Sequence, residues 1–582
     1  MDNFTKQMYL KKTILLLGLL SINTVIAAPQ VDPSIIQENQ DKQKIIEQEA
    51  QSRLENRPTI DSEKLIIKDI SLLATGQCQL TKQIFTYGAD VISQSKLNAI
   101  IQPYLNQCLD NKKITALVKN IQNWYLKAGY ITTRTTIKKP QNSFTEKGNL
   151  ELWVYEGLLG NFILNNNTAQ DKSRIKTAFP VATGDVLNIH DLDQGLEQLN
   201  SLFSQKFKMQ IKPSTRPGYS DIFLIELTRN TKKTQQLGLN YSNGGTKATG
   251  EDLYNLKYTK ENLFNINDST SLSIQKALPE RNNKSESIRV STRIPYGYWS
   301  FKLNYNSGNT LRTINSNTIA FRSISDNQTT QFSVNHVYSR SQKSKFELNS
   351  AIEFSDRKSF INDTLITVSS RQTASLNVGL LYTRYFNNST LILSPSISKG
   401  GPLFGAIANT PNIKKNQAHA EYNMFKFYSY LRHQFLPHSR YQFTLQNSVN
   451  AQYSDQALYG EKQFVLGGEY SIRGFKENVM SSDNGISVRN DIILPIGQWL
   501  YPWLQKPVIL PLNFKIHYDL GEGYPVVDGK RQSISGWGVG LEYNYKYLSL
   551  SYTVAAPIIN PDVFQEKQNR ISYLNLNLRY VF

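Results

Sequence analysis

One arginine lies in a glycine-rich stretch in which its side chain could take part in specific chemistry. The stretch reads Gly467-Gly468-Glu469-Tyr470-Ser471-Ile472-Arg473-Gly474-Phe475. A planar guanidinium forms bidentate, charge-assisted hydrogen bonds to a carboxylate, so Arg473 is suited to hold one conformation of a loop. Gly467, Gly468 and Gly474 let the chain turn tightly and enter a narrow space. The alternative is an ordinary glycine-containing surface hairpin with an exposed arginine.

No constellation of catalytic or metal-binding residues is visible elsewhere in the sequence. It contains no nucleophile elbow, no phosphate-binding loop and no cluster of His and Cys at metal-ligand spacing. The 6 His are scattered, and His517 is better interpreted as part of a polar wall than as a catalyst. We therefore expect no enzymatic activity, no cofactor and no bound metal.

The amino terminus has the pattern of a secretory signal peptide, predicted over residues 1–27. Lysines precede a short apolar core over residues 14–20, and Val25-Ile26-Ala27 offers small-residue cleavage chemistry. An uncleaved anchor is the alternative, but the apolar run is too short to span a bilayer comfortably. No later run of about 18 apolar residues follows, so a chain that crosses a membrane must do so as a barrel.

Export would place Cys78 and Cys108 in an oxidising compartment. A disulfide between them would close a loop of about 30 residues, for which the chain-entropy argument gives about 3–4 kcal/mol of stabilisation. Two buried thiols and a metal pair are the alternatives. We favour the disulfide because neither a histidine nor a further cysteine lies nearby.

The elements that must position these residues begin with a polar stretch over residues 28–56. It is predicted to form one helix, with Pro33 near its start and Asp32 as the N-cap. Its apolar residues are too sparse to build a core, so the helix must rest on another part of the protein or remain solvated. A short linker is predicted over residues 57–64.

A small α+β domain is predicted over residues 65–157. Apolar residues at helical spacing run from Ile114 to Tyr125, and Ala128-Gly129 ends this helix. Extended stretches follow over residues 130–138 and 150–155. Helices and strands within about 90 residues are typical of an α+β domain.

The second predicted α+β domain, residues 158–229, repeats this order of elements. Its amphipathic helix is marked by Leu192, Leu196, Leu199 and Phe203. Asn188, followed three residues later by Asp191, resembles a capping box at the start of that helix. Strands are predicted over residues 162–164, 207–212 and 222–227.

From residue 230 to residue 582 the hydrophobic pattern changes to a period of two. One apolar face is formed by Trp537, Val539, Leu541, Tyr543 and Tyr545. A soluble sandwich would also alternate, but about 350 residues with a broad polar face fit a lipid-facing barrel with a wet lumen better. The aromatic content of 11% agrees with a membrane barrel. The chain ends on an amphipathic strand with Tyr580 and Phe582, which resembles the recognition signal of bacterial outer-membrane barrels.

Two motifs resemble two-partner secretion (type Vb) outer-membrane transporters, the TpsB family of haemolysin secretion/activation proteins. Ile472-Arg473-Gly474-Phe475 is similar to the V/I-R-G-F/Y core of their conserved loop. Gly129-Tyr130-Ile131-Thr132-Thr133-Arg134 resembles a stretch of their first POTRA domain, and Val154-Tyr155-Glu156-Gly157 resembles its closing strand. The resemblance covers the whole chain.

The resemblance implies a transmembrane antiparallel β-barrel of sixteen strands over residues 230–582. Two periplasmic α+β POTRA domains, residues 65–157 and 158–229, would precede it. The amino-terminal helix, residues 28–56, would be a plug that threads the barrel lumen; a solvated tail is the competing interpretation.

The resemblance also implies that Arg473 folds into the lumen and meets Asp519 on the wall. Independently, the apolar residues Phe514, Ile516 and Tyr518 alternate with their neighbours, which places Asp519 on the inward face. The family pattern is roughly Phe-x-Asp-x-Gly, whereas this chain reads His517-Tyr518-Asp519-Leu520-Gly521. His517 therefore replaces the usual aromatic residue. Arg489-Asn490-Asp491 resembles the start of the following strand in the family.

The function implied by the resemblance is export of a large exoprotein that carries an amino-terminal secretion domain. Such cargo would be a haemolysin, an adhesin or a contact-dependent inhibition toxin, bound first by the POTRA domains through strand addition. Further expected partners are outer-membrane lipid, lipopolysaccharide and, during biogenesis, the barrel-assembly machinery. Nucleic acid is not expected, because the basic residues behind the net charge of +19 are dispersed.

Two other functions compete with export. A barrel-assembly protein that inserts other barrels shares the Arg-Gly-Phe loop but usually has more POTRA domains and no plug helix. A passive porin would have no use for two periplasmic docking domains. The order of elements in this chain disfavours both alternatives.

Overall fold

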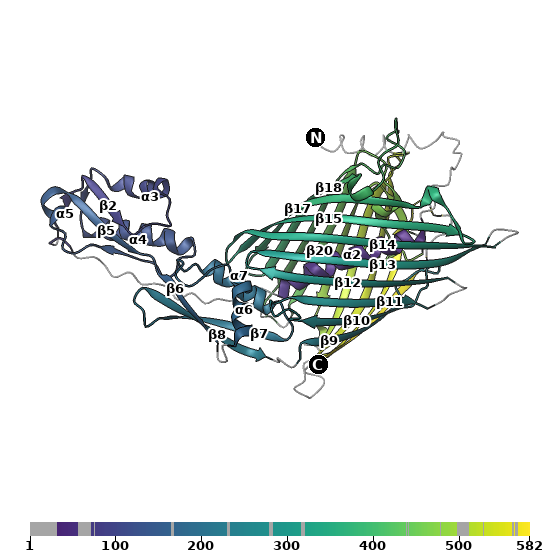
Figure 1. Cartoon of the computed structure of the whole chain (residues 1–582), viewed down its shortest axis with the longest axis horizontal. Coiled ribbons are helices and arrows are strands. Elements are labelled where there is room, and N and C mark those ends of the chain that lie inside the picture. Colours follow the sequence, from purple (N-terminus) through teal and green to yellow (C-terminus); the bar gives the residue numbers. More distant parts are fainter. Residues whose placement is uncertain are drawn as a thin grey trace, which may run out of the picture.

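A barrel at one end and two small domains in a row at the other make up the molecule (Figure 1). The structure is a computed structural model that describes residues 32–55, 72–74, 76–164, 168–229, 233–278, 283–315, 320–437, 439, 441–477, 479–497, 511–527, 529–561, 564 and 569–582. The predicted signal peptide, residues 1–27, and the predicted linker, residues 57–64, lie outside the described residues.

The barrel is a closed antiparallel sheet of sixteen long strands. They are β9 (Gln235–Ser242), β10 (Leu253–Glu261), β11 (Ser269–Ala277), β12 (Lys284–Tyr296), β13 (Trp299–Asn315), β14 (Ala320–Arg340), β15 (Ser344–Ile361), β17 (Arg371–Tyr385), β18 (Ser389–Gly401), β19 (Asn423–Phe435), β20 (Phe443–Ser454), β23 (Asn484–Leu494), β24 (Leu512–Tyr524), β25 (Gln532–Tyr545), β26 (Leu548–Ile559) and β27 (Ile571–Val581). The short strand β16 (Thr364–Leu365) pairs with β15 alone among the described strands. Closure comes from antiparallel pairing of β27 with β9, which places Arg579 opposite Gly238.

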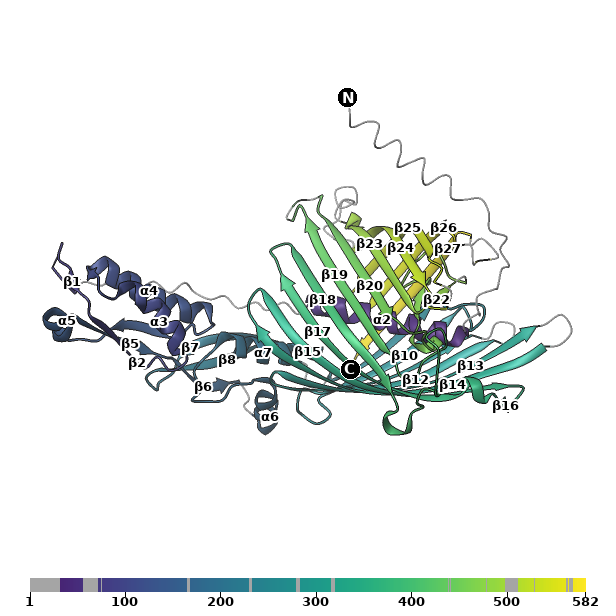
Figure 2. The same ribbon diagram turned by 90° about the horizontal axis from the view of Figure 1, so that it is seen from above.

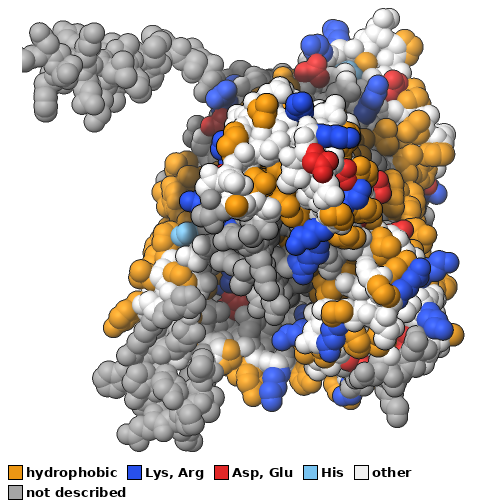
Figure 3. Space-filling model, turned by 90° about the vertical axis from the view of Figure 1, so that its left-hand side faces the viewer, with side chains coloured by type: hydrophobic (Ala, Val, Ile, Leu, Met, Phe, Trp, Pro, Cys, Tyr) orange, Lys and Arg blue, Asp and Glu red, His pale blue; other side chains and the backbone are white. Residues whose placement is uncertain are grey.

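The alternation predicted from the sequence separates an apolar outer wall from a polar lumen. Trp537 and Leu541 on β25 are 50% and 45% exposed on the outside of the barrel. Figure 3, viewed from the end that carries the small domains, shows hydrophobic side chains along the edges of the outline. An apolar exterior of this kind fits contact with lipid.

The first small domain packs three helices against a sheet with the strand order β2-β5-β4. Its elements are β1 (Gln79–Leu80), β2 (Gln83–Tyr87), α3 (Gln94–Ile101), η1 (Gln102–Tyr104), β3 (Cys108–Leu109), α4 (Asn111–Lys127), β4 (Arg134–Ile137), α5 (Asn142–Lys147) and β5 (Asn149–Tyr155). Ile114, Leu117 and Ile121 of α4 are fully buried, as their helical spacing predicts. The predicted strand over residues 130–138 is too long, because Thr133 N–H donates to the Tyr130 carbonyl in a turn before β4.

The second small domain has the strand order β6-β8-β7, with two helices on one face. Its elements are β6 (Leu158–Ile163), α6 (Ala169–Ala178), α7 (Ile189–Asn200), β7 (Gln205–Pro213) and β8 (Tyr219–Arg229). The predicted capping box at Asn188 is wrong. Asn188 does cap α7 by accepting from His190 N–H, but the Asp191 carboxylate instead accepts from the Tyr298 hydroxyl on the barrel. A tertiary contact has replaced the local one.

The amino-terminal helix α2, Pro33–Glu55, lies inside the barrel in both views (Figures 1 and 2). As predicted, Asp32 caps its start, since its carboxylate accepts from Ser34 N–H at 3.0 Å. Its 23 residues correspond to about 35 Å at 1.5 Å per residue, enough to traverse the lumen. Among the described helices, none combines the length and apolar character needed to cross a membrane.

Candidate functional site

The lumen holds two elements besides the wall, and the first is a folded-in loop. Short strands β21 (Phe464–Leu466) and β22 (Met480–Ser482) pair as a hairpin that carries the glycine-rich stretch. Ile472 and Phe475 are fully buried. They form one apolar cluster with the hairpin strands and with Ile534 of the wall strand β25. The hairpin therefore has a small core of its own, shared with the barrel.

Glycines shape this loop in two ways. Gly467 and Gly468 have φ angles of +117° and +95°, which residues other than glycine rarely adopt. Gly474 instead lies against the wall, where an added Cβ atom would sit 2.9 Å from the Ala556 carbonyl oxygen. A Cβ atom on the wall residue Gly521 would meet the loop in the same way, 3.1 Å from Ile472 Cδ1. The missing side chains allow the loop and the wall to approach closely.

Arg473 joins the loop to strand β24 through Asp519. Its Nε donates to Asp519 Oδ2 at 2.8 Å and its Nη2 donates to Oδ1 at 2.7 Å, which is a bidentate arrangement. The backbone N–H of Arg473 also donates to Asp519 Oδ2, at 3.0 Å. Asp519 is 0% exposed and Arg473 is 6% exposed. The two residues that the sequence paired are thus in direct, buried contact.

Strand β23 contributes two further charged residues that the sequence did not single out as partners. Arg473 Nη1 donates to Asp491, and Arg489 lies directly opposite Asp519 in the β23–β24 register. The resemblance placed the start of this strand at Arg489, but β23 begins at Asn484. The same alternation that placed Asp519 inward identifies them, because Ile486 and Ile492 of β23 face outward.

His517 occupies the wall beside this pair. It lies opposite Asp491 in the register and is 2% exposed. An added Cβ atom on Gly538 of the neighbouring strand β25 would clash with the imidazole ring. Gly538 therefore makes room for the His517 ring.

The second element in the lumen is α2, which contacts the hairpin through amide side chains. Gln43 Nε2 donates to the Val465 carbonyl at 3.0 Å, and Gln40 Nε2 donates to the Gly467 carbonyl at 3.3 Å. An added Cβ atom on Gly468 would collide with the Gln40 side chain. The helix therefore rests directly on the glycine-rich turn of the loop.

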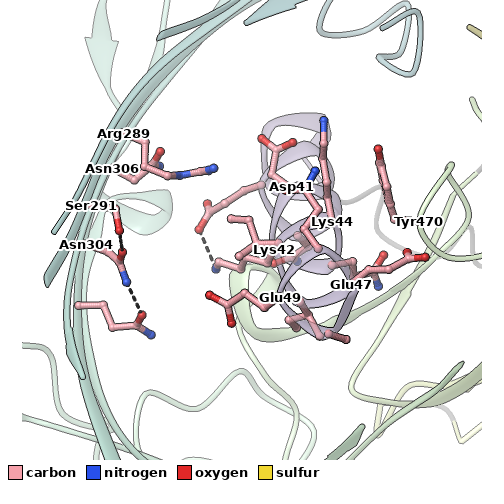
Figure 4. A pocket seen from close by; sticks show the side chains of 18 of the residues that line it. Asp41, Lys42, Lys44, Glu47, Glu49, Arg289, Ser291, Asn304, Asn306 and Tyr470 are labelled. Carbon is pink, nitrogen blue, oxygen red and sulfur yellow. Dashed lines mark hydrogen bonds and ion pairs between the residues drawn. The ribbon is translucent and has the colours of Figure 1, made fainter. Parts of the chain in front are cut away.

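Carboxylates on α2 also bind cations of the barrel wall. Glu38 accepts from Arg357 Nη2 on β15 at 2.7 Å, and Glu49 accepts from Lys302 Nζ on β13 at 2.7 Å. Glu47 accepts from Arg489 on β23. These contacts lie on strands around the barrel, and Figure 4 shows α2 between the two walls with Asp41 and Glu49 toward the side of Arg289.

Beside the helix, the lumen keeps a cavity of about 1710 Å³ lined mainly by polar side chains. No group of three or more His, Cys, Asp or Glu that could hold a metal ion occurs among the residues that the structure describes. The arrangement is a wet passage, closed in part by one helix and one loop.

The predicted POTRA motif lies at the joint between the two small domains. Gly129 has a φ angle of +98°, and its carbonyl accepts from Ile189 N–H at the start of α7. Thr132 touches Gly157, and the Thr133 carbonyl accepts from Gln122 of α4. The remaining members of the motif support the first domain: Tyr130 packs edge-on against Tyr125, and Arg134 lies opposite Tyr155.

Cys78 and Cys108 are joined in a disulfide with a sequence separation of 30 residues. The bond connects the start of β3 to the residue before β1.

At the other end of the chain, Tyr580 and Phe582 stack their rings at 5.8 Å, and Phe582 exchanges backbone hydrogen bonds with Gln235. The carboxyl terminus thus lies at the barrel seam.

Helix α7 fixes the second small domain to turns of the barrel. Glu197 accepts from Arg340 and, at 2.9 Å, from Lys345. Although burial opposes ionisation, these two cations lower the pKa of Glu197 to about 2. Nearby, burial raises the pKa of Asp193 to about 6, and its Oδ1 atom is buried with no hydrogen-bond partner among the described residues. The sequence did not reveal this contact, because both sides are ordinary charged residues until the fold brings them together.

The family described as haemolysin secretion/activation protein ShlB/FhaC/HecB matches residues 218–543, which is more than half of the chain. A POTRA domain of the ShlB type matches residues 80–157, and another POTRA domain matches residues 159–213. These matches cover the two small domains and most of the barrel.

Individual relatives align over nearly the whole length. The outer membrane transporter CdiB of Dickeya dadantii is 28% identical over 564 residues, covering 96% of this chain and 97% of the relative. The hemolysin transporter protein HpmB of Proteus mirabilis is 27% identical over 426 residues, covering 72% of each chain. The solved structure of CdiB from Escherichia coli has the same fold, with a TM-score of 0.81, 24% identity and coverage of 95% of this chain and 100% of that chain. Since the family match spans more than half of its residues, the chain belongs to the haemolysin secretion/activation protein family ShlB/FhaC/HecB and is an outer-membrane transporter whose POTRA domains lie in the periplasm.

Proposed function

We propose that this transporter exports one large partner exoprotein from the periplasm through the lumen of its barrel. The observation that carries the proposal is the content of the lumen. A polar helix, α2, lies beside a cavity of about 1710 Å³ and contacts its surroundings through separate polar side chains. Its displacement would open a passage for an extended polypeptide.

The cargo class follows from the relatives, which are named as transporters of haemolysin and as CdiB. We expect an exoprotein with an amino-terminal secretion domain, either a haemolysin, an adhesin or a contact-dependent inhibition toxin. The expected absence of enzymatic activity fits a family whose members are transporters. The same reasoning extends to outer-membrane lipid, lipopolysaccharide and the barrel-assembly machinery as partners in the membrane and during biogenesis.

The POTRA domains offer surfaces for the first contact with the exoprotein. Strands β2 and β4 form the edges of one sheet, and strands β6 and β7 form the edges of the other. Beside the β2 edge, Phe85 and Tyr87 are 41% and 38% exposed. An extended segment of the cargo could add to such an edge through backbone hydrogen bonds and rest on the exposed aromatic rings.

Inside the lumen, we assign Arg473 and Asp519 to holding the loop in one conformation. A buried ion pair contributes little net stability, but removal of one partner leaves an uncompensated charge. A fixed loop would preserve one side of the passage while α2 leaves. The alternative function, insertion of other barrels, has less support because two POTRA domains and a helix in the lumen fit the export architecture.

The test is secretion of candidate exoproteins with and without the transporter, in cells that make each at the same level. Arg473→Ala is measured beside the intact protein, and Arg322→Ala serves as the matched control because Arg322 pairs with Asp363 in an exposed position. Heat-modifiable migration of the outer-membrane fraction verifies the barrel level.

We expect one large protein to reach the medium or the cell surface only with the transporter. Secretion should fall with Arg473→Ala and stay normal with Arg322→Ala. If no exoprotein depends on the transporter while other barrels fail to assemble without it, insertion of barrels would replace export as the function.

A further inference from the structure

Three wall cations lie in one register across neighbouring strands. Arg579 on β27 is opposite Gly238 on β9, and Gly238 is opposite Lys257 on β10. Lys257 is opposite Ser273 on β11, which in turn is opposite Arg289 on β12. All of these residues line the cavity of the lumen. We call Arg579, Lys257 and Arg289 the cationic row.

The position of the cationic row can be judged from strand β10. Lys257 is its middle residue, four residues before Glu261, which accepts from the backbone N–H groups of Phe203 and Ser204 in the second POTRA domain. Arg579 is close to the carboxyl-terminal Phe582. A polypeptide that enters the lumen from the POTRA domains therefore passes the cationic row on its way through the barrel.

The cationic row forms no ion pair among the described residues, although Arg289 interacts electrostatically with Asp41 of α2. Small residues separate Arg579, Lys257 and Arg289 on the intervening strands. Cations two strands apart are separated by about 9–10 Å, close to the Debye length of about 8 Å at physiological ionic strength. Their fields therefore overlap and raise the local concentration of anions.

The resting protein already shows which anions this side of the wall accepts. Lys302, on the strand next to that of Arg289, binds the α2 residue Glu49 at 2.7 Å. Figure 4 shows Arg289 directed from the wall toward α2, on the side where Asp41 lies. In both places the neighbouring anion is a carboxylate carried by a polypeptide segment inside the lumen. Departure of α2 would remove these carboxylates and leave the wall cations open to others.

We propose that the cationic row is a carboxylate-binding site that receives acidic stretches of the entering polypeptide and makes the lumen selective for anions. The inference rests on the proposed export function only in naming the exoprotein as the polypeptide. The selectivity itself is a property of the wall. Arg579, Lys257 and Arg289 hold successive carboxylates loosely as an extended chain moves past, because each contact is exposed to water.

The first experiment measures ion selectivity of the full-length protein in planar bilayers under a KCl gradient. We expect the reversal potential to report preference for chloride over potassium. The variant K257Q/R289Q/R579Q should lose this preference, and K257R/R289K/R579K should retain it. A control variant with the same charge change, K284Q/K358Q/K399Q, removes exposed lysines that do not line the cavity and should behave like the unmodified protein.

The second experiment adds a synthetic polyglutamate peptide or a polylysine peptide to the periplasmic side of the same bilayers. Polyglutamate should block the current, and about tenfold more of it should be needed after K257Q/R289Q/R579Q. Equal block by the two peptides, or unchanged selectivity and block in that variant, would overturn the proposal. Because neither readout uses an exoprotein, failure here would leave the secretion result unaffected, and the reverse holds as well.

Discussion

The loop between β21 and β22 and the helix α2 share one lumen but are held in different ways. The loop shares a buried apolar cluster with the wall and is also anchored by the buried Arg473, which bonds to two carboxylates; one of them, Asp519, is 0% exposed. The helix is held by many separate contacts. Amide side chains reach backbone carbonyls at 3.0–3.4 Å, and three glutamates bind cations on different strands.

This difference teaches which of the two elements can leave. Breaking one buried, hydrogen-bonded ion pair costs about 3–5 kcal/mol at once. The hydrogen bonds from the amide side chains of α2 contribute about 1 kcal/mol each and can be replaced one at a time by water or by another chain. We therefore expect the loop to stay with the wall while the helix exchanges.

The largest effect should come from removing the partner of Arg473. Asp519→Ala leaves the buried guanidinium with only Asp491, and we expect the free energy of unfolding to fall by about 3–5 kcal/mol. Asp491→Ala, the matched control, removes one hydrogen bond and should cost about 1.5–3 kcal/mol. Thermal unfolding of the purified protein in detergent measures both values. Equal losses of unfolding free energy in the two variants would contradict the claim that Asp519 is the main partner of Arg473.

Substitutions at two glycines test the loop–wall contact and the loop–helix contact separately. Gly474→Ala should push the loop off the wall at Ala556 and cost up to about 3 kcal/mol of stability, with loss of secretion. Gly468→Ala should displace the flexible Gln40 side chain and loosen α2, and it should cost about 1–2 kcal/mol because the φ angle of +95° is unfavourable for alanine. Open probability in planar bilayers should therefore rise with Gly468→Ala. The comparison fails if both variants lose the same stability.

The contact between α7 of the second POTRA domain and the barrel is a third kind of attachment, and its stability should depend on pH. The raised pKa of Asp193, about 6, means that the folded state binds a proton more readily than the unfolded state, so stability increases as the pH falls from 7 toward 5. The lowered pKa of Glu197, about 2, makes its contribution decline only at more acidic pH. Asp193→Asn should raise stability at pH 7 by on the order of 2 kcal/mol and remove the increase between pH 7 and pH 5. Thermal unfolding at several pH values is the measurement, with the exposed residue Asp90 changed to Asn as the control.

The smallest change in stability should follow from loosening the helix. Glu49→Gln weakens the contact to Lys302, in which the Glu49 and Lys302 side chains are 53% and 34% exposed, and we expect the barrel to lose about 1 kcal/mol or less. The current through planar bilayers should nevertheless increase, because α2 leaves the lumen more often. An unchanged current would show that other contacts dominate the retention of α2.

The sequence was informative wherever a repeat or a motif extended over many residues. Alternation predicted the barrel and the inward position of Asp519, and helical spacing predicted α4 and α7. It did not predict which strands carry the partners of α2, because a single strand gives the direction of a side chain but not its neighbours across the lumen. Glu38, Glu47 and Glu49 look like ordinary solvated charges on a polar helix until the barrel surrounds them.

Local signals failed where a tertiary contact was stronger. Asp191 follows Asn188 at capping-box spacing, yet it binds Tyr298 on the barrel. Residues 130–133 have extended character in the sequence but turn toward α7 to join the two POTRA domains. Both departures lie at contacts between domains, which no local pattern encodes.

The direction in which α2 runs has a topological consequence. Ser34, near the start of the helix, contacts Arg357 toward one end of β15, whereas Glu49, near its end, contacts Lys302 at the end of β13 closest to the POTRA domains. The amino-terminal segment of the chain therefore runs lengthwise through the barrel that its own later residues form. This arrangement is not a knot, and α2 can be withdrawn toward the POTRA domains without breaking any strand pairing. The same geometry means that a bulky folded domain attached ahead of Pro33, at the end of the barrel far from the POTRA domains, would block this withdrawal sterically and keep α2 in the lumen.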